Sequence, residues 1–166
     1  MDIETQSLAH TGASTVKNET PVPSAPSGKT ILYACSGCSD AGELADRVAR
    51  QLTKEGVGEM SCLAGIGGRV KPLMMKGQKA DRIVVIDGCP LTCARHTLVL
   101  AGLKNFQHVK LHELGHRKGS CPVTEARVAE ASAAVAELVR EAAASASDED
   151  LTTVKNPNHF TPSVLA

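Results

Sequence analysis

Six cysteines are the residues whose types and spacing point most directly to chemistry. In chain order they are Cys35, Cys38, Cys62, Cys89, Cys93 and Cys121. The first two have CxxC spacing, and the fourth and fifth have CxxxC spacing, so each pair is able to chelate one ion. Zinc and iron–sulfur clusters both take four thiolate ligands. The start of the chain, MDIETQS, lacks a secretory pattern, so we expect a reducing, cytoplasmic setting in which clustered thiols favour metal or redox chemistry over disulfides.

The amino-acid composition argues against two classes of binding partner. The net charge is zero and aromatic residues make up only 2% of the chain, so bulk positive charge and base-stacking surfaces are both missing. No run of residues approaches the length of a membrane span. We therefore expect neither nucleic acid nor a membrane as a partner, while the sequence identifies no protein partner.

The elements that must position the cysteines alternate between strand and helix. Apolar runs and period-two patterns predict strands at 30–35, 60–63, 82–87 and 109–114. Apolar residues at helical spacing predict helices between Asp40 and Gly56, over 93–102 and over about 124–144, with Asp40 and Thr124 as N-caps. This alternation predicts an α/β fold of three layers, with a mainly parallel sheet of about four strands flanked by helices.

The rest of the chain divides around that domain. Residues 1–28 are rich in Ser, Thr, Pro and Gly and are predicted to be a disordered arm, and 146–166 are predicted to be a C-terminal tail. The α/β domain is thus expected over 29–145. Inside it, the glycine-rich stretch 64–68 is interpreted as a turn or as a backbone cradle for an anion beside Arg69.

Every cysteine falls in a predicted connection from a strand to a helix. In a parallel sheet these connections all lie at the carboxyl edge, where ligands also bind. Six thiols distant in sequence are therefore expected to meet along one side of the domain. The alternative, that they are core residues scattered by chance, predicts cysteines in helices and strand centres, which the pattern does not contain.

Two further residues are candidates for supporting the cysteines. Asp87 ends a predicted strand and is suited to orient a ligand or to cap the following turn. His96 lies one helical turn after Cys93, which suits a nitrogen ligand or proton carrier, although a surface histidine is the commoner case. Three other histidines, at 108, 112 and 116, are spaced by four in a predicted strand. Of these, His116 is expected nearest the cysteine edge and the other two at the surface.

Three motifs resemble the DGC-domain family of small bacterial and archaeal proteins. They are CSG at 35–37, CLAGIGG at 62–68 and DGCPLTCA at 87–94. The resemblance covers about residues 29–142 and implies zinc binding by four characteristic cysteines. By position these are Cys35, Cys62, Cys89 and Cys93. Cys38 and Cys121 stand where the family pattern has a small residue and a serine, so this chain carries two additional thiols.

The leading hypothesis is a metal-binding protein with zinc as the expected ion. The proposed ligands are the four family cysteines, with Cys38 and Cys121 as auxiliaries and Asp87 and His96 supporting them. The first alternative is a thiol-based redox enzyme or sulfur carrier with Cys38 or Cys93 as nucleophile. An iron–sulfur cluster protein and a purely structural or partner-binding domain remain open as well. No hydrolase motif stands out, and the sequence leaves open whether the protein is an enzyme.

Overall fold

A computed structural model describes residues 28–37 and 39–149 of the chain. All of the predicted arm except Gly28 and nearly all of the predicted tail lie outside these residues, and so does Cys38. The described part contains all the strands and helices discussed below.

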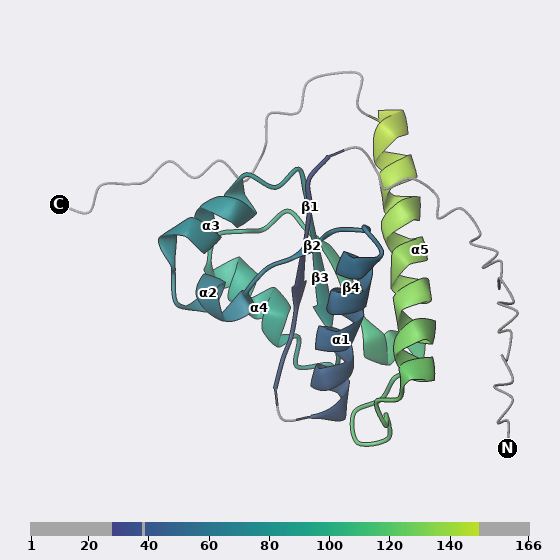
Figure 1. Cartoon of the computed structure of the whole chain (residues 1–166). Helices are drawn as coiled ribbons and strands as arrows, with labels where there is room; N and C mark the ends of the chain where they lie inside the picture. The colour runs from purple at the N-terminus through teal and green to yellow at the C-terminus, as the bar shows by residue number, and fades with distance from the viewer. Residues whose placement is uncertain (1–27, 38, 150–166) are drawn as a thin grey trace, which may run out of the picture.

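Four parallel strands form one sheet in the order β2-β1-β3-β4 (Figure 1). They are β1 (Thr30–Ala34), β2 (Glu59–Met60), β3 (Arg82–Asp87) and β4 (Gln107–Lys110). The two central strands pair in register from Thr30 opposite Arg82 to Ala34 opposite Ile86. Both are covered on both faces, which explains why their sequences are nearly continuous apolar runs.

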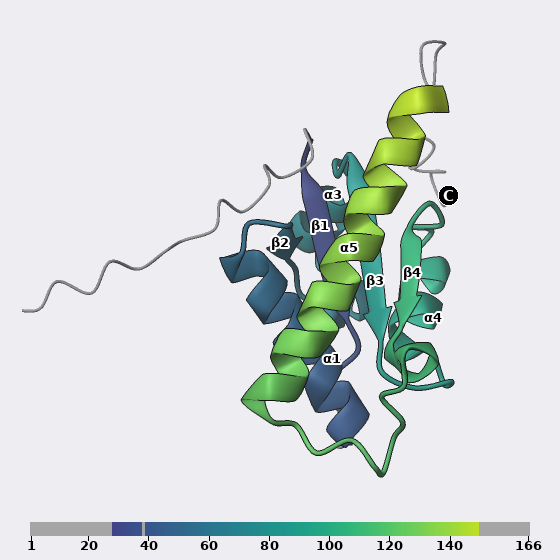
Figure 2. The same ribbon diagram turned by 90° about the vertical axis from the view of Figure 1, so that its right-hand side faces the viewer.

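Helices cover both faces of the sheet, which confirms the predicted three-layer α/β architecture. On one face lie α1 (Asp40–Lys54) and α5 (Glu125–Glu149), and Figure 2 looks onto this face. On the other face lie α2 (Leu63–Gly67), α3 (Lys71–Gln78) and α4 (Cys93–Leu100). A 3-10 helix, η1 (Leu111–Leu114), follows β4 and contacts α1. Among the described residues, no helix combines the length and the apolar character needed to cross a membrane.

Helix α1 packs through the apolar stripe that the sequence predicted. The buried residues of that stripe are Leu44, Ala45, Val48, Ala49 and Leu52. The predicted N-cap was wrong by one position. Ser39 is the N-cap and its Oγ accepts from Gly42 N at 3.1 Å, because Asp40 already has helical geometry and its carboxylate faces another loop.

Helix α5 begins as expected and ends later than expected. Thr124 Oγ1 accepts a hydrogen bond from Arg127 N at 3.3 Å, which fits its predicted role as N-cap. The helix continues to Glu149, five residues beyond the predicted end, since its last turns are rich in alanine and contain no glycine or proline. It is tied to the sheet by Arg82, whose guanidinium donates to Val139 O at 3.1 Å.

The short elements differ from the prediction. The second strand is only Glu59–Met60, and the glycine-rich stretch forms α2 in place of a turn or anion cradle. The segment 109–114 is a strand only up to Lys110 and then turns into η1. Helix α4 ends at Leu100, before Gly102.

Candidate functional site

The candidate site lies between the carboxyl ends of β1 and β3. The chain leaves β1 toward α1 on one face of the sheet and leaves β3 toward α4 on the other (Figure 1). Ligands of open α/β sheets bind at such a point, where the connections diverge. Cys35 follows β1 directly and Cys89 lies two residues after β3, so two of the predicted ligands flank this point.

Cys35 is the buried sulfur of the site. Its side chain is 7% exposed, and its Sγ accepts a hydrogen bond from Gly88 N at 3.1 Å. Burial raises the pKa of the Cys35 thiol to about 12, and the Gly88 hydrogen bond only partly opposes this. The acidic groups of Asp87, Cys89 and Cys93 raise that pKa further. Asp87, Cys89 and Cys93 therefore lie close enough to Cys35 to disfavour its ionisation.

Alkylation tests this description of Cys35. Since the pKa is about 12, only about a thousandth of Cys35 is thiolate at pH 9. We expect iodoacetamide to modify the exposed Cys62 and Cys93 near neutral pH while Cys35 stays unmodified, as read by peptide mass spectrometry of the metal-free protein. Equal labelling of Cys35 and Cys93 would contradict the burial and the raised pKa of the Cys35 thiol.

The protonated Cys35 thiol also adds folding stability that is present below the unfolded-state pKa and is lost as the pH rises toward 12.

Asp87 organises the start of α4. Its carboxylate is 1% exposed and accepts from Ala94 N at 2.9 Å and Arg95 N at 3.1 Å. It also lies 2.9 Å from His108 Nε2 on the neighbouring strand β4. The residue at the N-cap position, Thr92, makes no side-chain cap, so Asp87 reaches from the end of β3 to satisfy the first amides of the helix.

A tight turn separates the two cysteines of the CxxxC motif. Thr92 N donates to Cys89 O at 3.2 Å, and Thr92 has left-handed backbone angles, with φ 47° and ψ 47°. Such a conformation is uncommon for a residue with a Cβ. Cys89 is half-buried and Cys93 is exposed as the first residue of α4. The turn thereby presents one thiol at each of its ends.

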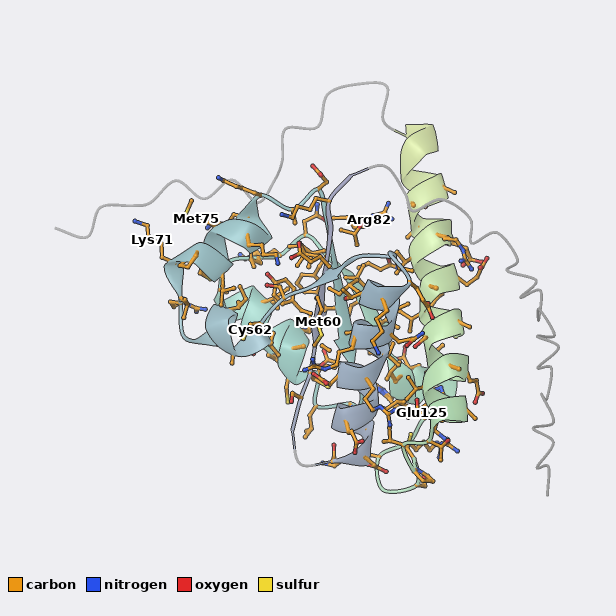
Figure 3. The ribbon with its side chains drawn as sticks, in the orientation of Figure 1. Met60, Cys62, Lys71, Met75, Arg82 and Glu125 are labelled. Atoms are coloured by element: carbon orange, nitrogen blue, oxygen red, sulfur yellow. The ribbon has the colours of Figure 1, made fainter. Side chains whose placement is uncertain are left out.

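Cys62 is held in a different setting. It is the N-cap of α2, and its Sγ accepts from Gly65 N at 3.4 Å. The exposed thiol lines a cavity of about 790 Å³ together with Met60 and Arg50, and Cys62 and Met60 are labelled in Figure 3. Neither Cys89 nor Cys93 lines this cavity.

Cys121 lies in the connection that precedes α5 and is fully buried. Its backbone N donates to Asp40 Oδ2 at 2.9 Å, and Gly119 N donates to both carboxylate oxygens of Asp40. These hydrogen bonds lower the pKa of Asp40. Asp40 therefore fastens the loop that carries Cys121 to the start of α1, two residues after Cys38.

Replacing Asp40 by asparagine is expected to loosen that loop. An amide accepts hydrogen bonds more weakly than a carboxylate, so the amides of Gly119 and Cys121 should exchange with deuterium severalfold faster. Because the pKa of Asp40 is lowered, the same loosening should occur in the unmodified chain as the pH falls through that lowered pKa. The matched change Asp46→Asn, at a half-buried carboxylate of α1 that pairs with Arg50, should leave both rates unchanged. Equal rates in all three proteins would contradict the role of Asp40.

The two histidines expected at the surface, His108 and His112, are both half-buried. His108 is not a surface residue, because its side chain is only 17% exposed and contacts Asp87. The register that sets Val85 opposite His108 puts this histidine on the face of the sheet that Asp87 also faces. His116 is buried, His112 is half-buried, and His96 is exposed on α4.

The cysteine thiols suit a thiophilic cation, and only some of the proposed ligands lie close to one another. Cys35, Cys89 and Cys93 come together from two connections, whereas Cys62 lines its own cavity and Cys121 is buried in the loop that Asp40 holds. Within residues 28–37 and 39–149, no three His, Cys, Asp or Glu side chains are placed to hold a metal ion together. All five described cysteines are free thiols.

Comparison with known proteins agrees with the motifs. The DGC domain family matches residues 31–137. The anaerobic and virulence modulator AnvM of Pseudomonas aeruginosa is 38% identical over 100 residues, which span 60% of this chain and 76% of AnvM. No solved structure matches the chain.

Proposed function

Because the chain belongs to the DGC-domain family, we propose that it binds a thiophilic metal ion, zinc, through cysteines at the carboxyl edge of its sheet. Cys35, Cys89 and Cys93 are the core of the proposed ligand set, and Cys62 is the fourth ligand. Cys38 and Cys121 remain auxiliaries. The reducing cytoplasm expected from the sequence would keep these thiols free to bind.

The observation that carries the proposal is the meeting of Cys35, which follows β1, with Cys89 and Cys93, which follow β3, at one edge of the sheet. Three groups that become anionic on losing a proton, Asp87, Cys89 and Cys93, lie near Cys35 and oppose its ionisation. A divalent cation removes this opposition, because a coordinated thiol loses its proton outright. When bound, zinc would supply positive charge to three or four thiolates and would link the end of β1 to the start of α4.

A functional role is favoured over a purely structural one. The core around β1 and β3 consists mainly of aliphatic side chains, with Cys35 and Cys121 packed among them, so the fold does not depend on a metal as a zinc finger does. The name of the relative AnvM describes a modulator, and for this reason we favour a regulatory site over a catalytic one. Asp87 and His108 would keep α4, and with it Cys93, in a fixed position.

Metal analysis of the full chain, purified anaerobically without a tag, tests the proposal. We expect about one equivalent of zinc per chain, and loss of most of it in Cys35→Ser, Cys89→Ser and Cys93→Ser. Cys121→Ser tests the auxiliary role separately, because unchanged zinc content in this variant would remove the buried Cys121 thiol from the ligand set. Urea unfolding of each variant separates loss of metal from loss of fold. Less than about a tenth of an equivalent of any metal, with six freely titratable thiols, would overturn the proposal.

The exposure of Cys93 at the first residue of α4 favours a thiol enzyme or sulfur carrier as the second candidate. A helix N-terminus stabilises a neighbouring thiolate, which serves nucleophilic chemistry as well as metal binding. Labelling with a limiting amount of alkylating agent distinguishes the two. Rapid modification of Cys93 alone in metal-free protein that takes up no zinc would favour thiol chemistry. Brown colour and visible absorbance in the anaerobic sample would instead identify an iron–sulfur cluster.

A further inference from the structure

An apolar groove lies between α3 and the last turn of α4, at the opposite end of α4 from Cys93. Its volume is about 550 Å³. The residues that line it are Arg69, Lys71, Met74, Met75, Gln78, Leu100, Ala101 and Gly102. Leu100 is 76% exposed and Met75 is 41% exposed, which is unusual for large apolar side chains on adjacent elements. Lys71 and Met75 are labelled on α3 in Figure 3.

Arg69 supplies a fixed positive charge at this groove. Its guanidinium donates to Ile66 O at 3.0 Å and to Leu100 O at 2.6 Å, so it bridges the ends of α2 and α4. Both acceptors are neutral carbonyls, and no carboxylate pairs with Arg69 in the described part of the chain. Its backbone is left-handed, with φ 56°, at a helix end where glycine is usual. The charge is therefore immobilised and not neutralised.

The charges of the groove all have one sign. Lys71 stands beside Arg69, no ion pair involves Lys71 among the residues that the structure describes, and no acidic residue lines the groove. Methionine side chains are flexible and polarisable, which suits a surface that adapts to another chain. A ligand that complements this groove must combine apolar side chains with carboxylates.

We propose that the groove between α3 and α4 binds an acidic amphipathic segment of a partner protein. Leucine-type side chains of that segment pack on Met74, Met75 and Leu100, and its carboxylates pair with Arg69 and Lys71. Helices dock in grooves of this kind through apolar residues spaced three and four apart. The proposal is independent of metal binding, because none of the cysteines lines the groove.

Methionine-methyl NMR of the full chain provides a direct readout. The probe is a synthetic peptide with leucines at helical spacing and glutamates flanking the leucine stripe. We expect saturable shifts of the Met74 and Met75 methyl signals, while Met60, which lines the other cavity, stays unshifted. A peptide with the same leucines and lysines in place of the glutamates should bind about tenfold more weakly.

Paired variants locate the interaction. Leu100→Ser and Lys71→Glu should each weaken binding of the acidic peptide about tenfold. The controls are Leu91→Ser, which changes an exposed leucine before the other end of α4, and Lys54→Glu, which changes a lysine at the end of α1. Both controls should bind as the unmodified protein does. All four positions are on the surface, and a thermal unfolding curve for each variant verifies its fold.

Several results would overturn the proposal. They are equal affinity for the two peptides, shifts at Met60 equal to those at Met74 and Met75, and no saturable binding. Shifts that depend on protein concentration alone would assign the groove to a second copy of the chain. Shifts produced by deleting residues 150–166 would assign it to the chain's own terminus. Binding to anionic vesicles in preference to the acidic peptide would assign it to lipid.

Discussion

Replacing Gly88 by alanine is expected to destabilise the protein by at least about 3 kcal/mol. A Cβ on Gly88 would lie 2.1 Å from Ala41 O and 2.5 Å from Ala41 C. These are backbone atoms of the first turn of α1, so no side-chain rotation relieves the clash. Either α1 or the connection after β3 must move, and in both cases the hydrogen bond from Gly88 N to Cys35 Sγ is disturbed.

Urea unfolding followed by circular dichroism measures the effect, and Gly67→Ala provides the control. A Cβ on Gly67 would meet only Thr97 Cγ2, at 3.7 Å, and alanine favours a helix. The control should therefore be as stable as the unmodified chain or more stable by about 0.5 kcal/mol. In Gly88→Ala we also expect faster alkylation of Cys35, because the connection that covers it has shifted. If the two glycine variants unfolded at the same urea concentration, the close approach of α1 to Gly88 would be refuted.

The central strands were predictable from local sequence, because each is buried on both faces. Arg82–Asp87 carries four consecutive β-branched residues, and its observed bounds match the prediction. β1 ends at Ala34, one residue earlier than expected. The cysteines were predicted to lie in the connections that follow the strands. In the structure all five described cysteines lie in connections from a strand to a helix or at the start of α4.

The short helices were not predictable in the same way. The stretch Leu63–Gly67 contains two glycines and has no apolar period long enough to identify a helix. It forms a helix because Ile66 is fully buried there and because Gly65 lets Leu73 pack closely against it. These contacts come from packing against α3 and the sheet, and packing overrides the weak intrinsic preference of the segment.

The internal order of the site depends on register, which the sequence leaves open. Asp87 was predicted to orient a ligand or to cap the following turn, and in the structure its carboxylate caps α4. His108 was predicted to lie at the surface, and in the structure it pairs with Asp87. Their pairing requires that β4 be the neighbour of β3 and that Val85 lie opposite His108. Likewise, nothing local indicates that Asp40 holds the loop before Cys121, since 79 residues separate Asp40 from Gly119.

Removing the Asp87 carboxylate is expected to cause the second large loss of folding stability. We expect Asp87→Ala to lower the free energy of unfolding by about 3 kcal/mol, because it leaves the amides of Ala94 and Arg95 and the ring of His108 without their acceptor in a buried position. Asp87→Asn keeps one acceptor oxygen but turns an NH₂ group toward another donor, so it should cost less, about 1–2 kcal/mol. Urea unfolding measures both values.

Two comparisons assign the effect to the cap on α4. His108→Ala removes one partner and leaves both helix amides bonded to Asp87, so it should cost only about 1 kcal/mol. Asp46→Ala breaks the surface pair with Arg50 and should cost about 0.5 kcal/mol. Deuterium exchange at Ala94 and Arg95 should accelerate in Asp87→Ala but not in His108→Ala. If His108→Ala were as destabilising as Asp87→Ala, the pairing of strands β3 and β4, and not the start of α4, would be what Asp87 stabilises.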